Sequence, residues 1–266
     1  FEGGTTYALT GRKVVLNAAT VGIDVTAGTV ATLDTPFSYS AAANALQKND
    51  LGRLVVSVDN TGWTGTTTIV SGVVQISNAS ALGSGQINVA APGNNTTLGG
   101  AALWLTGGIN LASPVNLATG GSNAWGIDYT GALYSASGTN TVSGAITNTS
   151  GVGLGIGVAP GSVLNITAGA MQNINSPTFN TVGNGVINLA GYTPNTASIT
   201  KIGSGTLNLT GATATTATPI VNGGVLNVSG AGQFTATAGN VTVQYGGVLS
   251  VNDTGTALTR FGGTGR

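Results

Sequence analysis

The sequence predicts an all-β protein, a β-solenoid of parallel strands that runs through residues 1–266 as one continuous domain. Three observations predict this class. Short runs in which Leu, Ile or Val alternate with polar residues are bounded by Gly and Asn, as strands are. Gly, Thr, Asn and Ser are poor helix formers and make up about half of the chain. A short phrase also recurs at steps of roughly 20 residues, which is the signature of stacked repeats.

The recurring phrase is Gly, a small or β-branched residue, Leu or Ile, a polar residue, and an aliphatic residue. Copies begin at Gly185, Gly205, Gly224 and Gly247, a related copy spans 161–166, and similar phrases occur at 52–56, 72–76 and 85–89. A period of about 20 residues is too short for a propeller blade and matches one coil of a solenoid. We therefore expect roughly a dozen coils of about 20 residues, with strands stacked about 4.8 Å apart along the axis. The Ala-rich segment 41–48 is expected to form a loop or a single turn.

Alternation within each phrase assigns its side chains to two faces of the strand. The predicted core residues are Leu164, Ile166, Ile187, Leu189, Leu207, Leu209, Leu226, Val228, Leu249 and Val251. The residues between them point outward and include Asn165, Asn188, Asn208 and Asn227. Equivalent positions stack in a solenoid, so these side chains are expected to form a hydrogen-bonded Asn ladder. The alternative explanation for these four aligned asparagines is that Asn is simply abundant in the chain, but only about one position in ten is Asn.

Composition excludes several kinds of chemistry. The chain has no His and no Cys, which excludes a Ser/His/Asp triad, a Cys nucleophile and a zinc site of the His or Cys type. Seven Lys and Arg residues spread over the whole length form no basic surface for nucleic acid. No run of 18 apolar residues occurs, so no membrane-spanning helix is expected. We expect no enzyme activity, no cofactor and no metal.

The strongest enzymatic alternative is a glycan-cleaving β-helix, which needs clustered carboxylates. Asp34 and Asp59 could stack across coils, with Lys48 or Arg53 as the only basic residues close in sequence. Solvated loop carboxylates are the simpler interpretation of these acids.

Aromatic residues give the best indication of ligand binding. Trp125, Asp128, Tyr129 and Tyr134 lie within ten residues of one another, and an aromatic ring beside an acid is suited to holding a sugar. The alternative is that these rings fill wide corners of the core. Trp63 is expected to fill such a corner, whereas Trp104, between Leu103 and Leu105, could face either way.

Two segments carry a family resemblance. Residues 48–89 contain Lys48, Gly52 and Leu54, then Asn60-Thr61-Gly62-Trp63-Thr64-Gly65, a Val-rich strand and Ala81-Leu82-Gly83-Ser84-Gly85. Residues 199–251 repeat the opening at Lys201-Ile202-Gly203-Ser204-Gly205 without the aromatic element. This pattern resembles the autotransporter-associated β-strand repeat of bacterial surface proteins. The resemblance implies a right-handed parallel β-helix that is exported and displayed on, or released from, the cell surface.

These observations favour a structural extracellular module, a stalk or filament segment of a bacterial cell-surface or secreted assembly. Its expected partners are copies of itself or flanking repeats stacked end to end, and the chain is expected to be a segment of a longer one. The alternative is an adhesin or glycan-binding module that uses the aromatic patch near Trp125–Tyr134 to bind surface glycans. A glycan-active enzyme and a phage fibre are weaker alternatives.

Overall fold

The computed structural model describes residues 1–39, 45–90, 100–118, 130–149, 153–167, 169–194, 198–213, 218–234 and 240–252. Throughout these ranges the regular structure consists of β-strands, and every strand pairing is parallel. Because the described ranges hold no helix, they hold none that could cross a membrane. The all-β solenoid predicted from the sequence is confirmed.

Three long sheets form the sides of the solenoid. Sheet 1 consists of β1 (Thr6–Ala8), β4 (Val30–Leu33), β7 (Arg53–Val56), β9 (Gly72–Ile76), β11 (Ala101–Leu105), β14 (Leu133–Ser135), β17 (Leu154–Val158), β20 (Pro177–Thr181), β23 (Thr200–Ile202), β26 (Ile220–Asn222) and β29 (Thr242–Val243). Sheet 2 consists of β3 (Thr20–Asp24), β6 (Ala45–Asn49), β8 (Thr67–Ile69), β10 (Ile87–Ala90), β13 (Val115–Ala118), β16 (Ile146–Thr147), β19 (Met171–Ile174), β22 (Tyr192–Pro194), β25 (Ala212–Thr213) and β28 (Gln233–Phe234). Sheet 3 consists of β12 (Asn110–Leu111), β15 (Thr139–Val142), β18 (Val163–Ile166), β21 (Val186–Leu189), β24 (Thr206–Leu209), β27 (Gly224–Val228) and β30 (Gly247–Val251). A fourth, short sheet pairs β2 (Val15–Leu16) with β5 (Ser38–Tyr39).

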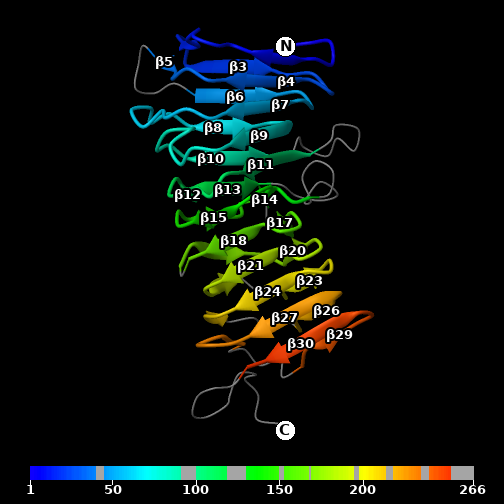
Figure 1. The fold of residues 1–266 in the computed structure, drawn as a ribbon. Coiled ribbons are helices and arrows are strands. Elements are labelled where there is room, and N and C mark those ends of the chain that lie inside the picture. The colour runs from blue at the N-terminus through cyan, green and yellow to red at the C-terminus, as the bar shows by residue number, and fades with distance from the viewer. Residues whose placement is uncertain are drawn as a thin grey trace.

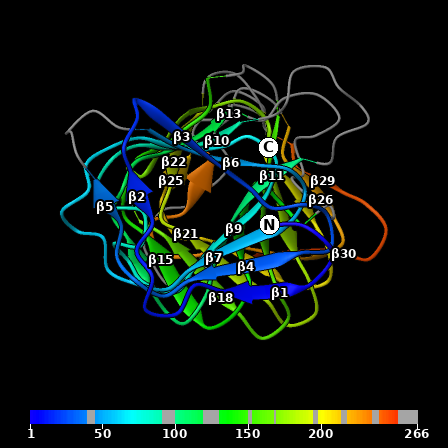
Figure 2. The same ribbon diagram turned by 90° about the horizontal axis from the view of Figure 1, so that it is seen from above.

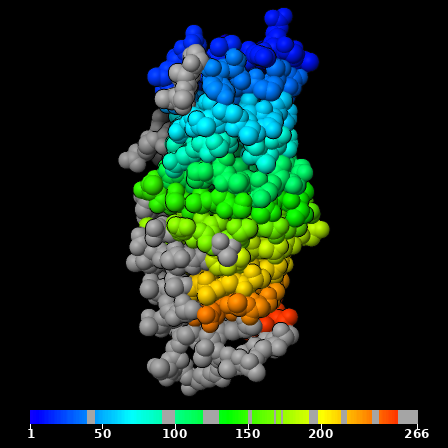
Figure 3. All heavy atoms as spheres, turned by 90° about the vertical axis from the view of Figure 1, so that its left-hand side faces the viewer, coloured from blue at the N-terminus to red at the C-terminus, as the bar shows by residue number. Residues whose placement is uncertain are grey.

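The chain winds from sheet 1 through sheet 3 to sheet 2 and then starts the next coil, as β17, β18 and β19 do. Figure 1 shows the coils stacked in sequence order between the two termini, and Figure 3 shows the same order as bands of colour down a column. One coil takes about 23 residues, and the solenoid has about nine turns. The coils are therefore slightly longer and slightly fewer than the sequence suggests.

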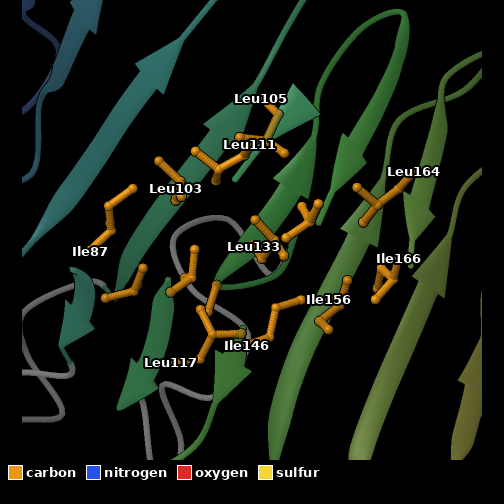
Figure 4. Packing of buried hydrophobic residues seen from close by; sticks show 14 of the residues in the cluster. Ile87, Leu103, Leu105, Leu111, Leu117, Leu133, Ile146, Ile156, Leu164 and Ile166 are labelled. Atoms are coloured by element: carbon orange, nitrogen blue, oxygen red, sulfur yellow. The ribbon is translucent and has the colours of Figure 1, made fainter. Parts of the chain in front are cut away.

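The interior of the column is aliphatic. Seen down the axis, the strands surround a central core (Figure 2). In the close view, side chains from sheets 1, 2 and 3, such as Leu133, Ile146 and Leu164, point toward one another across it (Figure 4). Eight of the predicted core residues are at most 1% exposed: Leu164, Ile166, Ile187, Leu189, Leu207, Leu209, Leu226 and Val228. The alternation inferred from the sequence therefore assigns their faces correctly.

The two predicted core residues of the last copy differ. Leu249 is only half-buried, and Val251 is 42% exposed. Both lie on β30, which among the described residues is the last strand of sheet 3 and pairs with β27 alone. A core side chain in a solenoid is covered by the coils on both sides of it, so placing Val251 in the core was wrong.

The segment expected to be a loop or a turn contains a strand. Ala45–Asn49 forms β6, which pairs with β3 and β8 and buries Leu46 completely. Pairing on both sides outweighs the weak helical preference of an Ala-rich segment. Residues 41–44 lie outside the described residues.

Candidate functional site

The most regular polar feature is the Asn ladder on the outer face of sheet 3. Asn165, Asn188, Asn208 and Asn227 are in register on β18, β21, β24 and β27 and are all half-buried. The side-chain amide of Asn188 donates to Asn165 Oδ1 (2.8 Å), that of Asn208 to Asn188 Oδ1 (2.7 Å), and that of Asn227 to Asn208 Oδ1 (3.0 Å). The amides of Asn188 and Asn208 each donate and accept along the axis, so the ladder ties four successive coils together.

A second polar feature is a buried lysine at a corner between coils. Lys48, on β6, is completely buried. Its ammonium group donates to the carbonyl oxygens of Asn49 (2.6 Å), Asp50 (2.6 Å) and Ser71 (3.1 Å). The first two acceptors belong to the turn that follows the lysine, and the third belongs to the next coil. The ammonium group therefore pins one coil to the next.

Lys201, on β23, forms the same arrangement at another corner. It is also completely buried, and its ammonium group donates to the carbonyl oxygens of Ile202 (2.8 Å), Gly203 (2.7 Å) and Gly223 (3.0 Å). Lys48 lies in sheet 2 and Lys201 in sheet 1. The motif therefore encodes a type of corner and is not tied to one side of the solenoid.

The two lysine corners share their backbone requirements. The second residue after each lysine has a positive φ, 62° at Asp50 and 77° at Gly203. In the next coil, Gly72 and Gly224 also have positive φ, and a Cβ at either would overlap carbonyl oxygens of the lysine's turn. Only glycine meets both conditions without strain. These constraints explain the Lys and Gly spacing seen in the sequence.

Burial changes the acidity of both lysines. Desolvation lowers the pKa of Lys48 from 10.5 to about 8, although Asp50 and Asp24 partly oppose the shift. Desolvation also lowers the pKa of Lys201 from 10.5 to about 8. A buried ammonium group is tolerated here because backbone carbonyls replace the lost water.

Two asparagines whose burial the sequence did not predict also bridge coils from inside. Asn60 accepts from the backbone N–H of Phe37 (2.7 Å) and donates to the carbonyl of Ala81 (2.7 Å). Asn140 accepts from the N–H groups of Gly108 (3.1 Å) and Ile109 (3.0 Å). Both are buried. Asn60 opens the aromatic element of the repeat at residues 60–65, whereas no sequence signal separates Asn140 from exposed asparagines, because Asn is common in this chain.

The predicted ligand-binding patch is only partly described. Trp125, Asp128 and Tyr129 lie outside the described residues. Tyr134 is half-buried on the outer face of β14, beside Trp104 of β11, with ring centroids 5.4 Å apart. Leu103 and Leu105 are completely buried, so Trp104 faces outward. Trp63 is 1% exposed and packs edge-on against Phe37, as a corner filler would.

The described part of the chain holds no group of three or more His, Cys, Asp or Glu residues suited to a metal ion. Asp59 is exposed and accepts hydrogen bonds from the backbone and hydroxyl of Thr61, which lower its pKa. Asp34 accepts from the Thr35 hydroxyl (3.2 Å). Each carboxylate is satisfied within its own loop.

A hollow of about 200 Å³ lies on the surface. It is lined by small, uncharged residues that include Thr61, Ser80, Ser84, Asn110 and Ser113. The Ser113 hydroxyl is already bonded to the carbonyl of Gly83 (2.8 Å). The hollow contains no charged or aromatic side chain that would orient a ligand.

Comparison of the chain with protein-family models, with curated proteins and with solved structures finds no match. The resemblance to the autotransporter-associated repeat therefore stays a prediction from the sequence.

Proposed function

We propose that this chain is a structural extracellular module, a stalk or filament segment of a bacterial cell-surface or secreted assembly. The observation that carries the proposal is the continuity of polar bonding along the axis. Backbone ladders, the Asn ladder and the lysine corners all run from coil to coil. Such bonding resists separation of the coils, which is what a stalk requires.

The chemistry of the chain suits an exported rod. With no Cys, the chain can form no disulfide before it has crossed a membrane. With seven charges of each sign, it presents a nearly neutral surface. The resemblance of residues 48–89 and 199–251 to a repeat of bacterial surface proteins supports the same location.

The stacked coils of the solenoid support a partner that is itself made of such coils. Strands at the end of a solenoid offer unpaired backbone groups to another β-strand. We propose that flanking repeats or further copies of the chain continue the stack end to end, a heterologous contact that does not close.

Antibody labelling of cells that produce the protein tests the proposal. Gold-labelled antibody raised against the chain is expected to bind intact cells along surface stalks or fibres, and deletion of the gene is expected to remove both label and fibres. Label that appears only after the cells are permeabilised, or fibres that persist unchanged in the deletion strain, would contradict the proposal.

A further inference from the structure

The middle of sheet 1 carries an outward-facing aromatic pair next to a cationic side chain. Trp104 and Tyr134 occupy equivalent positions on adjacent coils, and their rings lie 5.4 Å apart at an angle of 55°. The guanidinium carbon of Arg53, from β7, lies 5.8 Å from the centroid of the Trp104 ring. All three side chains keep part of their surface in solvent.

The coil after Tyr134 carries no side chain at the equivalent position. Gly157 is the partner of Tyr134 on β17 and is buried. A Cβ placed at Gly157 would overlap the carbonyl oxygen of Thr130 and come within 3.0 Å of the Tyr134 ring, so the Thr130 backbone and the ring together cover this glycine. On the other side, Gln75 is the partner of Trp104 on β9. A row of one amide and two rings thus follows the axis of the solenoid.

We propose that Trp104 and Tyr134 form a stacking platform for an acidic carbohydrate chain, with Arg53 binding a carboxylate of the sugar. Ring faces bind the apolar C–H faces of sugars, and a guanidinium group pairs with a carboxylate through parallel N–H donors. Successive coils are about 4.8 Å apart, so an extended glycan lying along the axis can place neighbouring sugar rings on neighbouring coils.

The platform does not depend on the structural role proposed above, because a stalk and a free module could both carry it. It also differs from the patch expected from the sequence, since it centres on Trp104 and Arg53 and shares only Tyr134 with that patch.

Binding of matched oligosaccharides by isothermal titration calorimetry tests the platform. The probes are oligogalacturonate, which is acidic, and cello-oligosaccharide of the same length, which is neutral. The native chain is expected to bind the acidic probe more tightly. Trp104→Val keeps a strand-favouring residue and is expected to weaken binding of the acidic probe at least about tenfold, equivalent to about 1.4 kcal/mol. Arg53→Gln is expected to remove the preference for the acidic probe.

Tyr245→Ser is the matched control, because Tyr245 is 98% exposed and lies on the turn before β30. It is expected to leave binding unchanged, and circular dichroism of each variant should match the native chain. The proposal is overturned if neither probe binds at millimolar concentration, if Trp104→Val binds as well as the native chain, or if Tyr245→Ser weakens binding equally.

Discussion

At the scale of single residues, the two buried lysines are the least expected feature of this molecule. Lys is rarely buried completely unless its charge is compensated, yet Lys48 and Lys201 are each bonded to three backbone carbonyls. The sequence singled out both lysines as the openings of repeat copies, but it did not predict their burial. The two copies share one sequence feature: a glycine follows the lysine four residues later. Between the lysine and this glycine, each copy has a residue with a positive φ.

Replacement of a corner lysine should destabilise the chain. Lys201→Met removes the ammonium group and leaves carbonyl acceptors buried without a partner, which is expected to lower the free energy of unfolding by about 1–3 kcal/mol. Urea denaturation at neutral pH measures the change. Lys13→Met is the control, because Lys13 is exposed, and a loss as large for Lys13→Met as for Lys201→Met would refute a special role for the corner.

The lysines should also give the chain an unusual pH dependence. Each folded-state pKa, about 8, lies below the unfolded value of 10.5. Between these values the unfolded chain binds more protons, so the free energy of unfolding rises with pH. Burial raises the pKa of Tyr134 above its usual 10.0, which acts in the opposite direction from about pH 10 upward. The rise is therefore expected between pH 8 and pH 10.

Denaturation midpoints measured at intervals across this range test the sign. The double variant Lys48→Met, Lys201→Met is expected to lose the rise, whereas Lys13→Met should retain it. A native chain whose stability falls steadily from pH 8 to pH 10 would mean that folding stabilises the charged lysines, and it would contradict the lowered pKa values.

At the scale of strands, the sequence predicted best where the repeat is most regular. The phrases at Gly185, Gly205, Gly224 and Gly247 all lie in sheet 3, so a single alignment assigned their faces. The earlier phrases lie elsewhere: 52–56 and 72–76 form β7 and β9 of sheet 1, and 85–89 leads into β10 of sheet 2. The phrase encodes a corner followed by a strand. Because the coils differ in length, copies of the phrase fall in different sheets, and the spacing in the sequence does not show which sheet a copy joins.

The Asn ladder makes a measurable contribution to sheet 3. Asn188 takes part in two ladder bonds, so Asn188→Ala is expected to lower the free energy of unfolding by about 1–2 kcal/mol. Asn184→Ala, in an exposed turn four residues earlier, is expected to change it by less than about 0.5 kcal/mol. Equal effects of the two variants would mean that the ladder adds nothing beyond backbone pairing.

Core burial should distinguish inner coils from the last one. Leu207 is completely buried, and Leu207→Ala is expected to cost about 2–5 kcal/mol. Val251→Ala, at a site 42% exposed, is expected to cost less than about 1 kcal/mol. Thermal denaturation of the two variants as isolated chains of 266 residues checks the difference, and losses of equal size would contradict the contrast between the inner coils and β30.

At the scale of the whole molecule, composition and repeat period were sufficient to predict a stacked column. They could not predict which coils carry aromatic side chains on the outside. Trp104 lies between two leucines, and this pattern is equally consistent with a Trp that faces inward and one that faces outward. Trp104 and Tyr134 are register partners on adjacent coils although they lie 30 residues apart in the sequence, a spacing well above the repeat. Which residues pair between coils of unusual length can be read only from the folded structure.

The central claim is that coils of this chain continue one another along the axis of a rod. Cryo-electron microscopy of the native assembly, isolated with an antibody against the chain, tests it most directly. The predicted result is an elongated density with a repeat of about 4.8 Å along its long axis, continuous beyond the coils of a single copy of the sequence. Compact particles in which the column ends against unrelated domains would contradict the claim.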